Sequence, residues 1–191
     1  MQRMAAWLLA MVLWSAVAHA REGYGRVFPD TLERAGKTLH LVGLGLREKY
    51  TFDVFVLGMY TEDGACDPGA MIRDDRVKVL RQEFVRTVSA RRLEGETRKV
   101  TEPRMPPELT EADRQQAETF IAMMRTEVRD GTVIEMTYVP GEGTRVTQDG
   151  RPLGPPLKGK RFQELLWDSY LGPESFCPKT RDQVLRSCRG S

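Results

Sequence analysis

The residue best suited to bind a ligand is Arg47, which stands at the end of an apolar run. The segment from His40 to Tyr60, HLVGLGLREKYTFDVFVLGMY, consists of two runs rich in Val, Leu and Phe joined by a short polar turn. Such runs predict two strands of a buried sheet. A guanidinium beside apolar surface needs a partner, and its planar fork of donors suits a carboxylate. Arg47 therefore either meets an anion or forms a surface ion pair with Glu48 or Glu135, worth under about 1 kcal/mol.

Metal and nucleophile chemistry have little support in this sequence. Cys66, Cys177 and Cys188 lie far apart without a C-x-x-C, and His19 and His40 are the two histidines. This pattern argues against a zinc site and against a Cys-His dyad. His40 could act as a general base beside a Ser or Cys, but a lone His in an apolar strand is more often a hydrogen-bonded structural residue. We expect no metal and no cofactor.

The remaining short motifs are better explained by backbone geometry than by catalysis. Gly43 and Gly45 form a lone GxG inside a strand, without the third glycine and the helix of a dinucleotide loop, so they predict a bulge or a close backbone approach. The acidic pairs Glu62-Asp63 and Asp74-Asp75 are adjacent in loop-like contexts and are interpreted as turn residues. There is no GxSxG, P-loop or HExxH sequence.

The first twenty residues have the pattern of a secretory signal. Arg3 supplies the positive region, an apolar run follows from Met4 to Val17, and Ala18-His19-Ala20 is a small-x-small cleavage site. The run is shorter than the bilayer span of about 20 residues. We expect cleavage after Ala20 and a periplasmic or secreted protein without stable membrane insertion. An uncleaved anchor is the alternative.

The mature chain suits one domain, residues 21–191, with a mixed charge pattern. Cleavage leaves about 171 residues, enough for one sizeable core, and no linker divides them. The formal charge of the whole chain is +2, with acidic and basic residues interspersed. Neither nucleic acid nor an anionic membrane is implied as a partner, and we expect a monomer. Glutamates interrupt the densest basic stretch, 86–99, which favours a solvated helix face.

Three cysteines in an oxidising, exported setting predict one disulfide and one free thiol. Cys177 with Cys188 is the local pairing, but a helix between them would hold their Cα atoms beyond the roughly 7 Å limit unless the chain turns back. Cys66 with either of the others is equally open.

The order of elements indicates hairpins with intervening helices. After an entry segment at 26–37, strands are expected at 38–46, 51–60, 76–85, 132–139 and 144–148, with a tight turn at Asp149-Gly150 into the next strand. Helices are expected at 89–99, 110–130 and 158–171 and after Pro178. Thr110 and Asp113 form a capping box. Met123 and Met124 are either core residues or an adaptable lipid-facing patch. The fold class is therefore α+β, with a mostly antiparallel sheet covered by helices on one face.

Four motifs in order resemble the bacterial chalcone isomerase-like family, and together they span about residues 28–185. They are Gly43-x-Gly45-x-Arg47, then FDVFVLGMYTED, VIEMTYVPGEGTRVTQDG and FQELLWDSYLGPES. The resemblance implies an open-faced β-sandwich in which a large antiparallel sheet and a helix layer enclose a ligand cleft.

The resemblance also implies roles for individual residues. In plant chalcone isomerases and related fatty-acid-binding members, the arginine after the glycine pair faces the cleft and contacts the ligand or its carboxylate, and Arg47 matches it. Phe55 stands where the plant enzymes have a threonine that helps to polarise the substrate ketone, which implies impaired chalcone cyclisation. Ser169 matches a threonine that lines the plant cleft, with Tyr170 beside it. The plant catalytic tyrosine or asparagine has no counterpart in 85–99.

Two hypotheses follow. The first is a non-catalytic exported protein that binds a fatty acid or similar amphipathic carboxylate through Arg47. The second is an isomerase, a chalcone isomerase-type intramolecular lyase acting on a phenolic or enone molecule, in which Tyr60, Tyr138 or Ser169 replaces the missing donor. Phe55 favours the first hypothesis.

Overall fold

The protein is built on one large antiparallel sheet. The computed structural model describes residues 19–189, so the predicted signal segment lies almost wholly outside the described residues. The sheet has seven strands in the order β3-β4-β5-β6-β7-β8-β9, and each neighbouring pair is antiparallel. These strands are β3 (Thr31–Arg34), β4 (Lys37–Lys49), β5 (Phe52–Thr61), β6 (Lys78–Phe84), β7 (Val133–Val139), β8 (Gly143–Gln148) and β9 (Arg151–Pro152).

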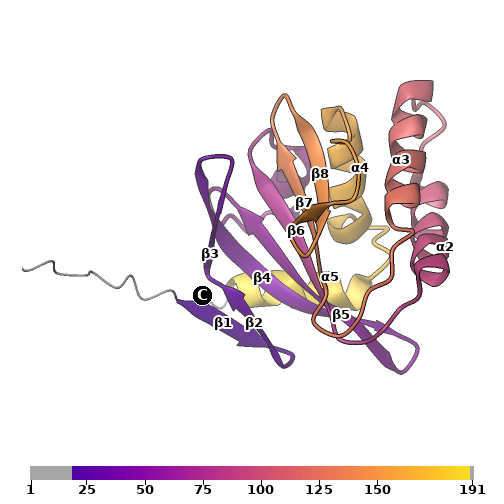
Figure 1. Cartoon of the computed structure of the whole chain (residues 1–191). Coiled ribbons are helices and arrows are strands. Elements are labelled where there is room, and N and C mark those ends of the chain that lie inside the picture. Colours follow the sequence, from indigo (N-terminus) through magenta and orange to yellow (C-terminus); the bar gives the residue numbers. More distant parts are fainter. Residues whose placement is uncertain (1–18, 190–191) are drawn as a thin grey trace, which may run out of the picture.

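The helices lie together on one side of this sheet (Figure 1). They are α1 (Pro68–Arg73), α2 (Ala90–Thr101), the short 3-10 helix η1 (Glu102–Arg104), α3 (Glu111–Met123), α4 (Lys160–Leu171) and α5 (Pro178–Arg189). A separate hairpin of β1 (Ala20–Gly23) and β2 (Arg26–Pro29) precedes the sheet. The predicted α+β fold with a helix-covered antiparallel sheet is confirmed.

The sheet buries apolar side chains on both faces because successive side chains of a strand point to opposite faces. On the helix side, Leu57 and Leu80 pack with Trp167 of α4 in the larger core. On the other side, Val56 and Val79 pack with Phe28 of β2 in a smaller core. The hairpin before the sheet therefore covers part of the face that the helices leave open.

Helix α5 lies directly against β4 because Gly43 and Gly45 have no side chains. A Cβ on Gly43 would come within 2.2 Å of the Val184 carbonyl oxygen, and one on Gly45 within 2.4 Å of the Thr180 carbonyl oxygen. A register shift also occurs between Leu41 and Gly43. The predicted bulge and close backbone approach are both confirmed.

Polar side chains of α5 satisfy the edge of β4 beyond the point where β3 ends. The Leu46 N–H donates to Oε1 of Gln183 at 2.7 Å, and the Leu46 carbonyl accepts from the Thr180 hydroxyl at 2.8 Å. The Leu44 N–H donates to the Ser187 hydroxyl at 3.0 Å. The backbone of β4 thus remains hydrogen-bonded although no strand continues alongside it.

One predicted helix is shorter than expected. The capping box of Thr110 and Asp113 is present, but α3 ends at Met123 rather than near Asp130. Val128 instead forms a β-bridge with Val88, in which the two N···O distances are 2.9 and 3.1 Å, and Val128 is fully buried. This long-range pairing stops the helix. A short helix, α1, also occupies part of what was expected to be a loop, and Asp67 caps it.

His40 does not have the structural role expected for it. It alternates with Leu39 and Leu41, whose side chains are in the smaller core, so its own side chain points to the opposite face. There it is exposed, and it makes no side-chain hydrogen bond to the described residues. The prediction of a hydrogen-bonded histidine was therefore wrong.

A disulfide joins the loop between β5 and α1 to the last turn of α5. Cys66, in the loop before α1, is bonded to Cys188 near the end of α5, with the Cα atoms 5.9 Å apart. Cys177 is free and buried. One disulfide and one free thiol were expected, and the structure selects among the pairings that the sequence left open.

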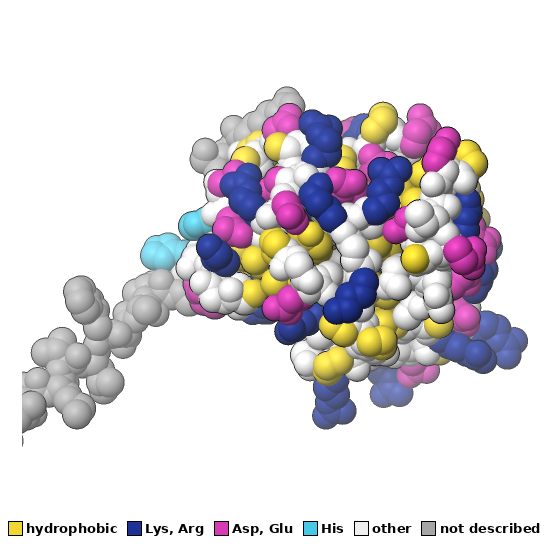
Figure 2. Space-filling model, turned by 90° about the horizontal axis from the view of Figure 1, so that it is seen from above, with side chains coloured by type: hydrophobic (Ala, Val, Ile, Leu, Met, Phe, Trp, Pro, Cys, Tyr) yellow, Lys and Arg dark blue, Asp and Glu magenta, His cyan; other side chains and the backbone are white. Residues whose placement is uncertain are grey.

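The surface carries both signs of charge. On the face shown in Figure 2, basic and acidic side chains are interspersed rather than gathered by sign. Across residues 19–189, no helix has the length and apolar character needed to cross a membrane.

Candidate ligand-binding cleft

A cleft of about 150 Å³ lies between the sheet and the helices. Its floor is formed by side chains of β4, β5 and β6, and its walls by α2, α3 and α4. Most of its surface is apolar. The aromatic and aliphatic lining includes Phe55, Phe84, Leu93, Phe120, Met124, Phe162 and Leu166.

Strand register determines which side chains form the floor. Arg47 of β4 is opposite Phe55 of β5, which is opposite Phe84 of β6. Directly opposed residues share one face of a sheet, so these three form one row across the floor. The rings of Phe55 and Phe84 meet edge to face with centroids 5.5 Å apart. A cation therefore stands at the end of an aromatic row.

Arg47 is half-buried in this cleft and lacks an acidic partner. Within residues 19–189 it forms no ion pair and no hydrogen bond, and its guanidinium carbon lies 5.3 Å from the centre of the Phe176 ring. Glu48 pairs with Lys179, and Glu135 is held by Arg34, so the surface ion pairs considered for Arg47 do not form. Its donors remain free for an anion.

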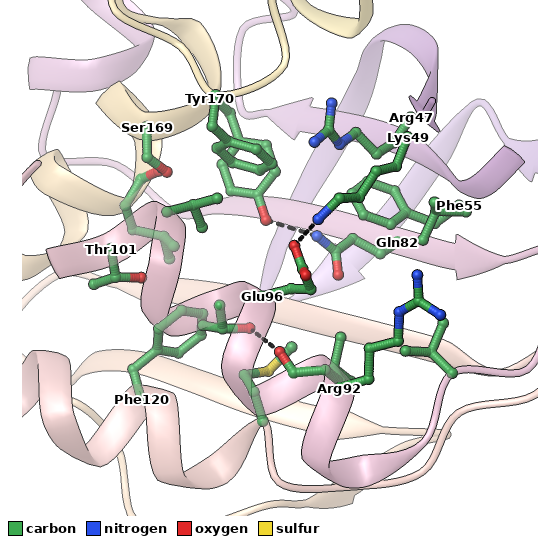
Figure 3. Close-up of a pocket in the computed structure, with 18 of the residues that line it drawn as sticks. Arg47, Lys49, Phe55, Gln82, Arg92, Glu96, Thr101, Phe120, Ser169 and Tyr170 are labelled. Atoms are coloured by element: carbon green, nitrogen blue, oxygen red, sulfur yellow. Dashed lines mark hydrogen bonds and ion pairs between the residues drawn. The ribbon is translucent and has the colours of Figure 1, made fainter. Parts of the chain in front are cut away.

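Two further polar groups lie near this cation. Gln82 of β6, 3% exposed, donates a 2.6 Å hydrogen bond from Nε2 to the hydroxyl oxygen of Tyr170 in α4. Figure 3 shows these two side chains pointing toward one another within the cleft. Because Gln82 donates to the oxygen, the hydroxyl proton of Tyr170 remains for an acceptor in the cleft.

Burial keeps the Tyr170 hydroxyl neutral. Loss of solvent raises the pKa of Tyr170 well above its ordinary value of 10.0, although the positive charge of Arg47 and the Gln82 hydrogen bond act in the opposite direction. Burial likewise raises the pKa of the Cys177 thiol, with Ser175 and Arg47 opposing it. At neutral pH the polar end of the cleft therefore offers the Arg47 cation and the neutral hydroxyl donor of Tyr170.

Charged side chains also line the mouth of the cleft. Lys49, at the end of β4, forms an ion pair with Glu96 of α2 and so links the sheet to the helix layer (Figure 3). This hydrogen-bonded pair lowers the pKa of Glu96. Arg104 is bound to backbone carbonyls, including that of Glu174 at 2.9 and 3.0 Å. Glu96 is the one acidic residue among the described lining residues.

The structure brings together four of the six predicted ligand-binding residues. Arg47, Phe55, Ser169 and Tyr170 line the cleft, although the Ser169 hydroxyl donates to the Leu166 carbonyl at 2.6 Å.

Tyr60 and Tyr138 lie outside the cleft. The Tyr60 side chain belongs to the smaller core on the opposite face of the sheet, and its hydroxyl donates to the Pro29 carbonyl at 2.9 Å. The Tyr138 hydroxyl bonds to Asp75, away from the cleft lining. The two methionines have different places, so neither alternative holds for both of them. Met124 lines the cleft, whereas Met123 packs near Gly154.

Sequence reasoning missed Gln82, Phe176 and the Lys49–Glu96 pair. A signal for Gln82 was available, because it is a polar residue on the apolar face of the strand that carries Leu80 and Phe84. No local pattern identifies Phe176, which lies in the connection between α4 and α5 and reaches Arg47 only through the fold. Within residues 19–189, no cluster of His, Cys, Asp and Glu could hold a metal ion.

Comparisons with known proteins agree with this architecture. A sequence model described as chalcone isomerase-like matches residues 20–186. No curated protein has a significantly similar sequence. Among solved structures, a fatty-acid binding protein of Arabidopsis thaliana is similar, with a TM-score of 0.72 and 17% identity over 89% of this chain and 97% of that chain. At this level of identity the likeness establishes the fold.

Proposed function

Because the chain belongs to the chalcone isomerase-like family, we propose that it is an exported, non-catalytic protein that binds a fatty acid or similar amphipathic carboxylate in the cleft. One observation carries the proposal: Arg47, half-buried beside apolar side chains, has no acidic partner in the described part of the chain. The carboxylate of the ligand would supply that partner.

The polar end of the cleft suits a carboxylate. The guanidinium of Arg47 offers a planar fork of donors, and a hydrogen bond between charged groups is about twice as strong as one between neutral groups. The free hydroxyl proton of Tyr170 supplies another donor near the same place. A neutral alcohol or hydrocarbon would leave the positive charge of the guanidinium unpaired, which favours an anionic head group.

The rest of the cleft suits an alkyl chain. Phe55 and Phe84 form the floor, and Leu93 and Phe120 belong to the helix walls. Transfer of each CH₂ from water to such surroundings contributes about 0.8 kcal/mol. A long alkyl chain of about 16 methylenes would therefore contribute about 13 kcal/mol, against the roughly 8 kcal/mol of micromolar binding, and the remainder would offset the cost of ordering the ligand.

Export rests on the sequence of the first twenty residues. Cleavage after Ala20 would leave Arg21 as the first residue and remove the His19 carbonyl, which accepts a 2.9 Å hydrogen bond from the Asp30 N–H. It would also shorten β1 by one residue, since Ala20 pairs with Pro29. The intact mass of the protein recovered from the periplasm of a bacterial host tests export and cleavage. The proposal also includes a monomeric state.

No particular observation favours the isomerase alternative. It requires a hydroxyl to replace the donor missing at Phe55. Two of the candidate hydroxyls, those of Tyr60 and Tyr138, lie outside the cleft, and that of Ser169 donates to a backbone carbonyl.

Substitution of Arg47 tests the binding site directly. Fatty acid extracted with the purified protein is measured by mass spectrometry, and affinity is measured with a series of fatty acids. Arg47→Gln should weaken affinity by about 2 kcal/mol, roughly 30-fold, because a buried charge pair is lost. The matched control is Arg151→Gln, an exposed arginine on β9 outside the cleft lining, which should bind as the unsubstituted protein does. Absence of bound lipid together with no affinity for any of the fatty acids would contradict the proposal.

A further inference from the structure

The turn between β4 and β5 exposes two aromatic rings beside the mouth of the cleft. Tyr50 is 85% exposed and Phe52 is 53% exposed. Tyr50 lies in the turn after Lys49, where it adopts a positive φ of 57°, and Phe52 is the first residue of β5. Lys49 and Phe52 also line the cleft. Phe52 is therefore both exposed and part of the cleft lining, and the exposed ring of Tyr50 lies two residues before it.

Each ring is accompanied by a cation. The guanidinium carbon of Arg86 lies 4.6 Å from the centre of the Phe52 ring, and Nζ of Lys49 lies 5.8 Å from the centre of the Tyr50 ring. These distances permit cation–π attraction. Aromatic rings with adjacent basic groups suit the boundary between lipid head groups and acyl chains, where one part of the surface is apolar and the other wet.

The rim carries positive charge that no ion pair in the described part of the chain neutralises. Arg86 and Arg92 line the cleft and have no acidic partner, whereas Lys49 is paired with Glu96. Of the acidic residues nearby in sequence, Glu48 pairs with Lys179 and Glu94 with Arg125, and Asp53 is exposed without a partner. This surplus of positive charge is confined to the rim, so it is compatible with the balanced charge of the whole chain.

We propose that this rim surface, consisting of Tyr50, Phe52, Arg86 and Arg92, docks on a bilayer that contains anionic phospholipid. The two rings would enter the head-group region while the two guanidiniums approach lipid phosphates. The protein would lie on the membrane without spanning it. Only the purpose of docking, transfer of the ligand between lipid and cleft, rests on the proposed function.

Vesicle sedimentation tests the docking. The full chain is expressed in an exporting bacterial host, and the form that accumulates is purified, with its mass recorded. Binding is measured with vesicles of phosphatidylcholine alone and of phosphatidylcholine mixed with phosphatidylglycerol. We expect binding to the anionic vesicles that falls at high salt. The double variant Tyr50→Ser/Phe52→Ser should lose about tenfold in affinity, and so should Arg86→Gln/Arg92→Gln.

A matched control is available in the β1–β2 hairpin. Tyr24 and Val27 are 45% and 61% exposed and lie outside the rim surface. Tyr24→Ser/Val27→Ser should bind anionic vesicles as the unsubstituted protein does. Equal loss of affinity in Tyr50→Ser/Phe52→Ser and in the control Tyr24→Ser/Val27→Ser would show a nonspecific hydrophobic effect and would overturn the proposal.

A local probe identifies the part of the protein that meets the lipid. Cys66 and Cys188 are bonded and Cys177 is buried, so a cysteine introduced by Tyr50→Cys is the reactive one for a polarity-sensitive fluorophore. Its emission should shift to the blue with anionic vesicles, and that of the same label at Tyr24→Cys should not. Shifts at both positions, or at neither, contradict docking through the rim surface.

Two further outcomes have distinct meanings. If light scattering shows a dimer that Tyr50→Ser/Phe52→Ser converts to monomers, and vesicles are not bound, a second copy of the chain covers the rim and the proposal is overturned.

Docking is measured with delipidated protein, and Arg47→Gln should dock normally. Loss of fatty-acid binding with intact docking therefore separates failure of the proposed function from failure of this inference.

Discussion

Arg47 lacks an acidic partner because the strand geometry directs the nearby carboxylates elsewhere. The register of β4 with β5 shifts between Arg47 and Glu48, and Glu48 reaches Lys179 instead. Glu135 lies between Ile134 and Met136, which face the helices, so its own carboxylate is on the opposite face. There Arg34 holds it through hydrogen bonds of 2.7 and 2.9 Å. The free guanidinium is thus a consequence of register rather than of a local excess of bases.

Strand alternation also explains which predicted site residues meet. Phe55 and Leu57 of β5 face the helices, whereas Val56 and Tyr60 face the smaller core. Because Tyr60 is an odd number of positions from Phe55, the two could not share a face of a regular strand. The two-residue alternation of a strand therefore argued against placing Tyr60 in the cleft with Phe55. The place of Tyr138 depends on its contact with Asp75, which no local pattern predicts.

The glycines of β4 provide a residue-scale prediction. Gly45→Ala should reduce the free energy of unfolding by about 2 kcal/mol, because its Cβ would lie 2.4 Å from a backbone oxygen of α5 and one element must move. Gly95→Ala in α2 is the matched control. Nothing lies within 4 Å of its Cβ position, and the helix should gain about 1 kcal/mol. Urea denaturation measures both, and a change of the same sign in the two variants would contradict the packing argument.

At the scale of elements, local patterns predicted strands β4 to β8 and the helix starts, but they missed β1, β2 and β3 and the early end of α3. The capping box at Thr110 requires only residues three apart, so the sequence shows it directly. The end of α3 depends on the bridge between Val88 and Val128, residues from segments far apart in the chain. The same limit applies to the disulfide, since spacing alone left three pairings open and only the position of α5 beside the loop at Cys66 decides among them.

The disulfide anchors the element that covers β4. It links residues 122 positions apart, and closing a loop of roughly 100 residues in the unfolded chain stabilises the folded state by about 4.7 kcal/mol in the chain-entropy model. Cys66→Ser/Cys188→Ser should therefore reduce the free energy of unfolding by about 3 to 5 kcal/mol in urea.

Thiol titration provides the accompanying control. Without reductant, the native protein should show no reactive thiol, and the urea-unfolded protein should show one, because Cys177 is free but buried. Three reactive thiols in the unfolded protein, or unchanged stability of the double serine variant, would contradict the disulfide.

Over the whole molecule, the two faces of the sheet are filled differently. α5 covers β4 closely at Gly43 and Gly45, but this helix begins at Pro178, with Thr180 against Gly45. Beyond that point, from Arg47 onward, α2 and α4 form the walls instead, and the layer opens into the cleft. The opposite face has a smaller core beneath the hairpin. The cleft thus lies where the covering helix begins, and its polar end lies at the same boundary.

Buried tyrosines make the stability of the whole molecule sensitive to alkaline pH. Burial is the largest factor that raises the pKa of Tyr60, Tyr138 and Tyr170 above the ordinary 10.0. In the unfolded chain these hydroxyls ionise near pH 10, whereas in the folded protein they stay protonated. Above pH 10 the unfolded state therefore binds fewer protons, and the free energy of unfolding falls as pH rises, by up to about 1.4 kcal/mol per pH unit for each tyrosine.

Lys78 has the opposite effect over a lower range. Burial lowers its pKa below the ordinary 10.5, so the unfolded state binds more protons between these two values and stability rises with pH there. Of these groups only Lys78 acts below about pH 10, so we expect thermal stability to rise slightly with pH there and to fall steeply at higher pH, where three tyrosines outweigh one lysine. Melting followed by circular dichroism measures the fall. Absorbance at the phenolate band should show at least three of the five tyrosines still protonated at about pH 11 while the fold persists. Ionisation of all five in a protein that keeps its native circular dichroism would contradict the burial of these hydroxyls.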